Sequence, residues 1–264
     1  MNRFNLQRGF TLAELTVVLI IVGLLLGGML IPLGAQTDIR YRSDTAKALT
    51  DIREALIGYA IVNGRLPCPA DRSIATATTN AGAEAVSAVG GPCACTSATS
   101  GIAVATGGAA CSDTTPGSVT GVLPWATLGL PETDAWGNRF TYRVTTRFGR
   151  IASGQTTFGS CTPGSNPAAT AFALCSAGDI TVYTNSALTT TVASGIPAIV
   201  VSHGKTTGGA WTTSGTQIAG AAGDELENGD NDADFVSNTI IDDQLIWVSP
   251  NLLMNRMIAA GKLP

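Results

Sequence analysis

Charge and histidine are scarce in this sequence, and their scarcity excludes several kinds of protein. Only 13% of the 264 residues are charged, and the formal net charge is −4. Because a nucleic-acid-binding protein generally presents a basic face, we expect no nucleic acid among its partners. The only histidine, His203, has no partner placed by the sequence for acid–base chemistry.

Catalytic motifs are also missing. The nucleophile elbow Gly-x-Ser-x-Gly occurs nowhere in the chain. Gly204-Lys205-Thr206 matches the end of a phosphate-binding loop, but Ile199 occupies the position of its first glycine. We therefore expect no enzymatic activity.

Charge is completely absent from Leu15 to Ile31. The 24 residues 10–33 would form about 36 Å of helix. A bilayer has a hydrocarbon core of about 30 Å, so residues 10–33 are predicted to form a transmembrane segment.

A basic leader and one carboxylate flank the start of this segment, in the order Arg8-Gly9-Phe10-Thr11-Leu12-Ala13-Glu14-Leu15. A secretory signal is cut after its apolar core, whereas the Gly9-Phe10 junction precedes the core. After cleavage there, the new amino group of Phe10 would lie about 6 Å along the helix from Glu14. Glu14 would then pair with this amine in its own chain or in a neighbouring one.

This order of parts resembles the prepilin signature of type IV pilins and type II secretion pseudopilins. The resemblance implies that a prepilin peptidase removes residues 1–9, that Phe10 is N-methylated, and that Glu14 sets the assembly register with other subunits. It implies a single-pass inner-membrane protein with a periplasmic head before assembly. Afterwards the subunit would lie in a cell-surface filament or a periplasmic pseudopilus. Two alternatives are a signal peptide cut after Ala35 and a plain membrane anchor with an incidental glutamate.

The helix is expected to continue beyond the membrane. Apolar residues recur every three or four positions, at Ala46, Leu49, Ile52, Leu56, Tyr59 and Ala60. Asn63-Gly64 would end the helix. The expected organisation is therefore a leader (1–9), a long helix (10–64) with a transmembrane and an amphipathic half, and an extracytoplasmic head (65–264).

The head is predicted to be α+β, with an antiparallel sheet packed on the long helix and a short C-terminal helix. Alternating side chains predict a strand over residues 139–148, and further strands are expected at 180–184, 196–202 and 239–248. Ser249 and Pro250 mark the start of the C-terminal helix. The run from Thr133 to Tyr142 resembles the Asp-Pro-Trp-Gly-x-x-Tyr-x-Tyr segment of pseudopilins, with Ala135 and Phe140 as departures.

Six cysteines lie outside the apolar segment, and an even number after an export signal predicts structural disulfides. Fifteen connectivities are possible. We expect Cys161 to pair with Cys175 and Cys111 to pair with Cys93 or Cys95. The low-complexity stretch 73–121 is expected to be a disulfide-tied loop. The cysteines are Cys68, Cys93, Cys95, Cys111, Cys161 and Cys175.

Eight of the chain's 19 acidic residues lie within 224–243. Asp230, Asp232 and Asp234 alternate as in a calcium loop, although Phe235 and Ile241 occupy the EF-hand glycine and glutamate positions. The segment is interpreted either as a calcium site or as a solvated acidic loop.

Three arginines share one face of the predicted strand 139–148, namely Arg139, Arg143 and Arg147. They are interpreted either as a hydrated surface or as a contact for a polyanion or an acidic loop.

The favoured function is a type IV pilin-like structural subunit, with a minor pilin preferred because the head is long and rich in cysteine. A type II secretion pseudopilin and a pilus-tip adhesin or polyanion-binding module are the alternatives.

Overall fold

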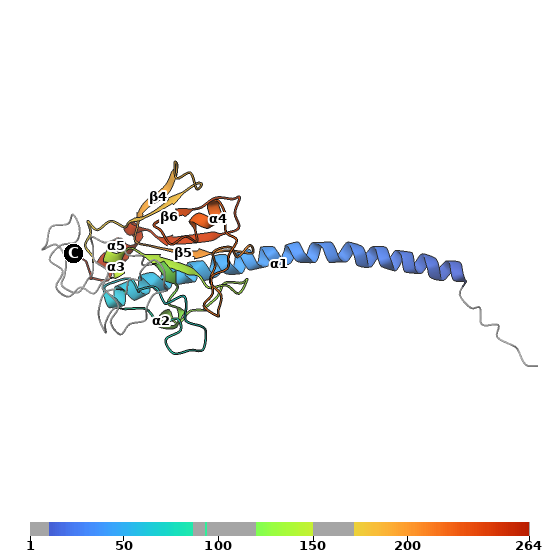
Figure 1. Cartoon of the computed structure of the whole chain (residues 1–264), viewed down its shortest axis with the longest axis horizontal. Coiled ribbons are helices and arrows are strands. Elements are labelled where there is room, and N and C mark those ends of the chain that lie inside the picture. Colours follow the sequence, from blue (N-terminus) through green and yellow to red (C-terminus); the bar gives the residue numbers. More distant parts are fainter. Residues whose placement is uncertain (1–10, 87–92, 94–119, 150–171, 264) are drawn as a thin grey trace, which may run out of the picture. The chain divides into compact units, whose positions relative to one another are not determined.

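The computed structural model describes residues 11–86, 93, 120–149 and 172–263 (Figure 1). The chain divides into two compact units, Met1–Ser43 and Asp44–Pro264. Helix α1, Leu12–Asn63, contributes residues to both units. Of the expected segments, the leader 1–9 lies outside the described residues.

The second half of α1 is amphipathic, as its sequence period predicts. Leu49, Ile52 and Leu56 are buried, each with 3% exposure or less, whereas Asp51 is exposed. The helix ends where Gly64 adopts a left-handed conformation, with φ of 70°. Its N–H donates to the Ala60 carbonyl at 2.8 Å. Glycine is favoured at this position because it lacks a Cβ that would clash.

Four strands form an antiparallel sheet in the order β1-β2-β5-β7. Tyr142 pairs with Val200, and Val200 pairs in turn with Ile246. All five residues of the inner strand β5 are buried. The strands span Thr120–Val122 (β1), Thr141–Val144 (β2), Ala198–Ser202 (β5) and Gln244–Val248 (β7).

A second sheet has three strands in the order β4-β3-β6. Strands β3 and β4 are antiparallel with register shifts, whereas β3 and β6 are parallel. The predicted α+β class with an N-terminal helix and an antiparallel sheet is confirmed, but this mixed sheet was not foreseen. Its strands span Ile180–Tyr183 (β3), Thr191–Ile196 (β4) and Asp234–Val236 (β6).

The second unit is built in three layers, because the four-stranded sheet is covered on both faces. On one face, Tyr142 and Val200 pack with Leu56 of α1. On the other face, Ile199 and Val201 pack with residues of the three-stranded sheet. Side chains on both faces of the central sheet are therefore buried. The members of this second core that come from the three-stranded sheet are Ile180, Val182, Ile196 and Phe235.

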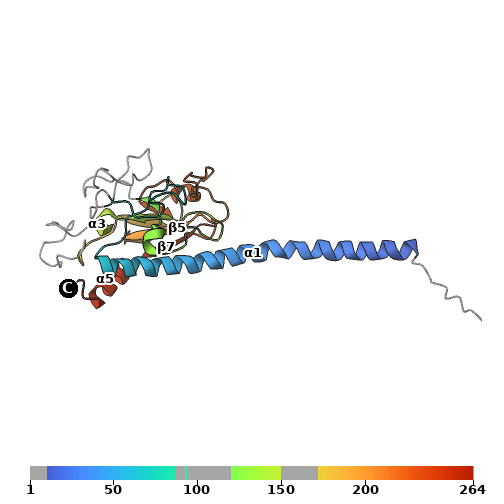
Figure 2. The same cartoon turned by 90° about the horizontal axis from the view of Figure 1, so that it is seen from below.

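In the described part of the head there are four shorter helices. Helix α5 lies beside the C-terminal end of α1 (Figure 2) and buries Leu253, Met254 and Met257. Ser249 is its N-cap residue and Pro250 opens its first turn, but the Ser249 hydroxyl makes no capping hydrogen bond. The helices span Trp125–Leu128 (α2), Thr146–Gly149 (α3), Asp224–Glu227 (α4) and Pro250–Ala259 (α5).

The strand predicted over residues 139–148 is shorter in the structure. Only Thr141–Val144 forms β2, and Thr146–Gly149 turns into α3.

Much of the predicted loop 73–121 lies outside the described residues. Within the described part, Trp125 packs directly over Gly82, where a Cβ would come within 2.2 Å of the indole ring. Glycine is required there because no larger residue fits beneath the ring.

Candidate functional site

The first turn of α1 holds Glu14 in a reciprocal contact with Thr11. The Thr11 backbone N–H and hydroxyl donate to Glu14 Oε2 at 2.8 and 2.9 Å. The Glu14 N–H donates to Thr11 Oγ1 at 3.3 Å. This arrangement is a capping box, which satisfies N–H groups that have no partner within the helix. Glu14 therefore stabilises the start of the helix, and it also carries the negative charge next to the uncharged run from Leu15 to Ile31.

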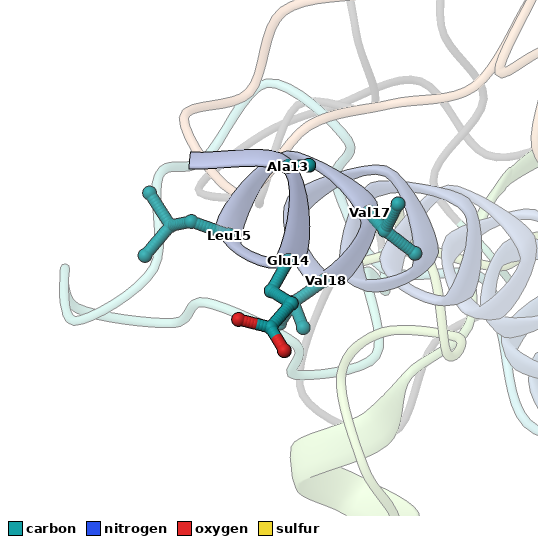
Figure 3. A pocket seen from close by; sticks show the side chains of 5 residues that line it. All are labelled: Ala13, Glu14, Leu15, Val17 and Val18. Atoms are coloured by element: carbon teal, nitrogen blue, oxygen red, sulfur yellow. The ribbon is translucent and has the colours of Figure 1, made fainter. Parts of the chain in front are cut away.

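Glu14 is surrounded by exposed apolar side chains. Together with Ala13, Leu15, Val17 and Val18 it lines an open pocket of about 650 Å³ (Figure 3). Leu15, Val17 and Val18 are each more than half exposed. An apolar surface of this kind usually marks a contact with protein or lipid. The site is thus a single carboxylate on a turn of helix whose neighbouring side chains are apolar and point to several sides (Figure 3).

Comparison with known protein families identifies this segment. Residues 4–30 match the prokaryotic N-terminal methylation motif. The chain carries a prepilin-type signature. The resemblance inferred from Gly9, Phe10 and Glu14 is confirmed at the level of the motif. The prepilin-type motif supports a type IV pilin-like or pseudopilin family member, points to a structural subunit, and implies a peptidase and other pilin subunits as partners. No curated protein and no solved structure matches the chain.

Two expectations about the prepilin-type segment stay predictions. Gly9 and Phe10, at the expected cleavage and methylation site, lie outside the described residues. Among the described residues, the structure contains no helix with the length and hydrophobicity of a membrane span. The expected span 10–33 includes Phe10 and the side chains of 26–33, which are also outside the described residues.

A disulfide joins Cys68 to Cys93 in the head. The expected pairing of Cys93 with Cys111 is therefore wrong. Cys175 is also disulfide-bonded. The other three cysteines lie outside the described residues, so Cys161–Cys175 and Cys95–Cys111 stay predictions.

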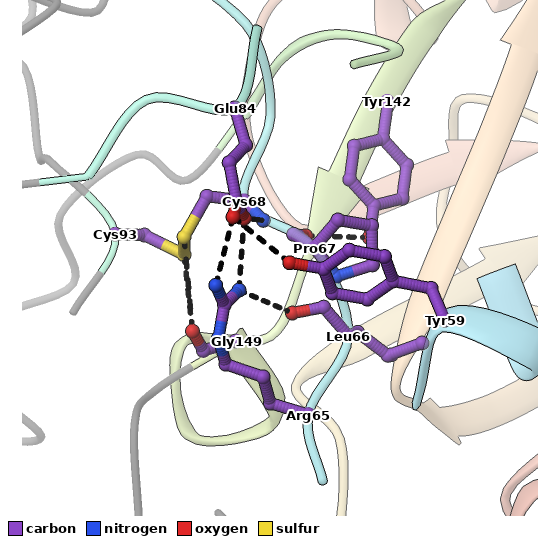
Figure 4. Close-up of a disulfide and its surroundings, with 9 residues drawn as sticks. All are labelled: Tyr59, Arg65, Leu66, Pro67, Cys68, Glu84, Cys93, Tyr142 and Gly149. Atoms are coloured by element: carbon purple, nitrogen blue, oxygen red, sulfur yellow. Dashed lines mark hydrogen bonds and ion pairs between the residues drawn. A yellow bond between two sulfur atoms is a disulfide. The ribbon is translucent and has the colours of Figure 1, made fainter. Parts of the chain in front are cut away.

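A partly buried ion pair adjoins this disulfide (Figure 4). The Arg65 guanidinium donates two hydrogen bonds of 2.8 Å to Glu84, which also accepts from the Tyr59 hydroxyl and the Cys68 N–H. Burial would raise the pKa of Glu84, but the Arg65 charge and the hydrogen bonds from Arg65, Cys68 and Tyr59 together lower that pKa. Burial raises the pKa of Tyr59 to about 12. No local sequence pattern predicts this cluster, because Arg65 and Glu84 are 19 residues apart.

The structure corrects the expected exposed arginine stripe. Arg139 is 0% exposed, and its Nε donates to Glu132 at 2.8 Å. Arg143 is 6% exposed and donates to Thr120 and Asp179. Loops and the second sheet cover this face, so neither residue is available to a polyanion. Arg147 lies in α3 and is partly exposed.

The acidic segment brings a different trio together from the one expected. Carboxylate oxygens of Glu227, Asp230 and Asp232 lie within 4.8 Å of one another, whereas Asp234 lies in β6 and pairs with Thr181. Burial raises the pKa of Glu227, and nearby negative charges raise it further. Oxygen ligands in such a group suit calcium. Calcium binding stays a prediction, with Glu227 in place of Asp234.

His203 is buried beside potential partners that the sequence did not reveal. Its Nε2 lies 2.8 Å from Thr141 Oγ1, and its Nδ1 lies 3.9 Å from Asp243 Oδ2. The second distance is too long for a hydrogen bond. Burial lowers the pKa of His203 to about 4 and raises the pKa of Asp243 to about 7. Because His203 is 0% and Thr141 5% exposed, a substrate has no access to the Thr141 hydroxyl.

Proposed function

We propose that this protein is a structural subunit of a type IV pilus-like filament, with a minor pilin as the preferred form. The observation that carries the proposal is a carboxylate at Glu14, fixed by Thr11 among exposed apolar side chains and inside the matched motif. Cleavage after Gly9 would leave a mature chain that begins with methylated Phe10. The apolar helix would hold this chain in the inner membrane until assembly.

Assembly follows from the electrostatics of Glu14. A lone carboxylate is costly in an apolar bundle unless it meets a positive charge. The amine of Phe10 on a neighbouring subunit supplies that charge and fixes one register between helices. The apolar side chains around Glu14 then pack against neighbouring helices, and the heads form the outer surface.

Two substitutions separate this role from simple helix capping. Glutamine replaces glutamate in capping boxes, so Glu14→Gln keeps the cap but removes the charge. Thr11→Ala keeps the charge and costs about 1 kcal/mol of helix stability. We expect Glu14→Gln to be processed normally but lost from sheared filaments on immunoblots, while Thr11→Ala is still incorporated. Normal incorporation of Glu14→Gln would overturn the proposal.

Mass spectrometry of the mature chain gives an independent test. A mature N-terminus at methylated Phe10 supports the proposal, whereas one at Gln36 would indicate a conventional signal peptide. A type II secretion pseudopilin shares the same N-terminal chemistry. A gene neighbourhood with a secretin and a secretion ATPase but no retraction ATPase would favour that alternative.

A further inference from the structure

A groove opens on the head where β7 meets α1 and the start of α5. Its volume is about 300 Å³, and four partly exposed apolar side chains line it: Leu245, Ile246, Trp247 and Leu252. Strand β7 is the last strand in the order of the four-stranded sheet. The groove therefore combines a sheet edge with apolar side chains that solvent still reaches.

Arg53 gives this groove a positive charge with unused hydrogen-bonding capacity. Its Nε is buried and has no hydrogen-bond partner among the described residues. The nearest carboxylate recorded for its guanidinium is Glu54, at 3.8 Å, and Glu54 also attracts Arg256 at 3.9 Å. The Arg53 side chain is nevertheless 32% exposed, so a carboxylate from outside can reach the guanidinium, which favours such a partner. The groove thus fits an apolar side chain that has an acidic neighbour.

Helix α4 presents such a pair. Leu226 is 50% exposed, and Glu225 and Glu227 flank it in the sequence. An exposed leucine between two glutamates is complementary to an apolar groove with an arginine at its margin, both in charge and in hydrophobicity.

Within one molecule, α4 is held away from the groove. Asp224 accepts hydrogen bonds from the Ser186 N–H at 2.8 Å and from Asn238 Nδ2 at 2.7 Å. Figure 1 shows α4 and α5 apart, at different ends of the sheet layers. The α4 that enters the groove must therefore come from a second copy.

We propose that α4 of one subunit docks into the β7–α5 groove of another, with Leu226 between Trp247 and Leu252 and Glu225 against Arg53. The two surfaces are different, so the contact is head-to-tail. Such a contact, repeated without closing, generates a filament. This inference rests on the proposed filament function and specifies how the heads contact one another.

Crosslinking between two versions of the full-length chain tests this contact. One version carries Leu226→Cys and the other Leu252→Cys, and both are expressed together in the native host. We expect a disulfide-linked dimer on non-reducing gels only when both versions are present. Val192→Cys replaces Leu226→Cys in the control, because Val192 is 48% exposed but lies on β4. A missing dimer, or an equal yield with the control, would overturn the inference.

Charge reversal provides a second test that introduces no cysteine into the groove. With a lysine-reactive or photochemical crosslinker, Arg53→Glu should lower the yield of dimers linked through α4 and the groove about tenfold. Combining it with Glu225→Arg should restore most of that yield, and the absence of rescue would count against the pairing. One outcome is that the chain enters filaments while neither the cysteine pair nor the chemical crosslinker yields a dimer. In that case the docking inference fails and the proposed function stands. If the chain never enters filaments, the proposed function fails.

Discussion

Replacing Asp243 with asparagine should change how the stability of the head depends on pH. The Asp243 carboxylate accepts a hydrogen bond of 2.8 Å from Asn228 and faces the neutral His203 ring. Asp242 and Glu225 add negative charge nearby. Asparagine keeps an oxygen that accepts from Asn228, but it carries no charge at any pH.

The size of the effect follows from the pKa of Asp243, which burial raises from 3.8 to about 7 in the folded protein. The folded state therefore binds the proton more tightly than the unfolded chain does. This contribution to stability is fully present below pH 3.8 and is lost as the pH rises through about 7. The difference between the unfolded and folded pKa values corresponds to about 4 kcal/mol in the free energy of unfolding. The pKa of His203 is lowered to about 4, so its contribution to stability increases as the pH rises. His203 is present in both proteins, so this contribution does not distinguish them.

Urea unfolding of the full-length chain in mild detergent, followed by tryptophan fluorescence, measures this difference. All four tryptophans lie in the head. We expect Asp243→Asn to gain stability relative to wild type as the pH rises from 4 to 7.5, by up to about 4 kcal/mol. The exposed Asp51→Asn is the matched control and should show no such trend. A difference between Asp243→Asn and wild type that stays constant over this range would refute the reasoning.

Three further outcomes are expected in the same unfolding assay. Replacing Cys68 and Cys93 with serine should cost about 3.5 kcal/mol, because the disulfide closes a loop with a sequence separation of 25; an unchanged midpoint would contradict this. Glu84→Gln should cost about 1.5–3 kcal/mol by giving the partly buried Arg65 a neutral partner in place of a charged one, and Glu84→Asp should cost less. Calcium should raise the unfolding midpoint of wild type but not of Glu227→Gln; an equal rise in both would exclude Glu227 as a ligand.

The elements that depend on local sequence were predictable. The end of α1 at Gly64 and the start of α5 at Ser249 follow from residues within one turn of each boundary. The capping box also depends on local sequence, since Thr11 and Glu14 have the spacing that it requires.

The features that were missed depend on distant segments. Arg143 was expected to be exposed because alternation along a strand does not reveal what covers each face, and its partner Asp179 is 36 residues away. Strand β4, Thr191–Ile196, has mostly small or polar residues, and β6 has only three residues, so neither has a clear period. The Cys68–Cys93 pairing needed a fold that brings their Cα atoms to 5.2 Å.

The position of that crosslink determines how the head responds to mechanical tension. Cys68 lies five residues after the last residue of α1. A force that unfolds the chain from the helix is therefore transmitted through the disulfide, and the loop between Cys68 and Cys93 is not extended. The bridge withholds about 85 Å of contour length, at ~3.4 Å for each of the 25 residues it spans. A fully extended subunit would therefore be about 85 Å shorter in an oxidising compartment than after reduction.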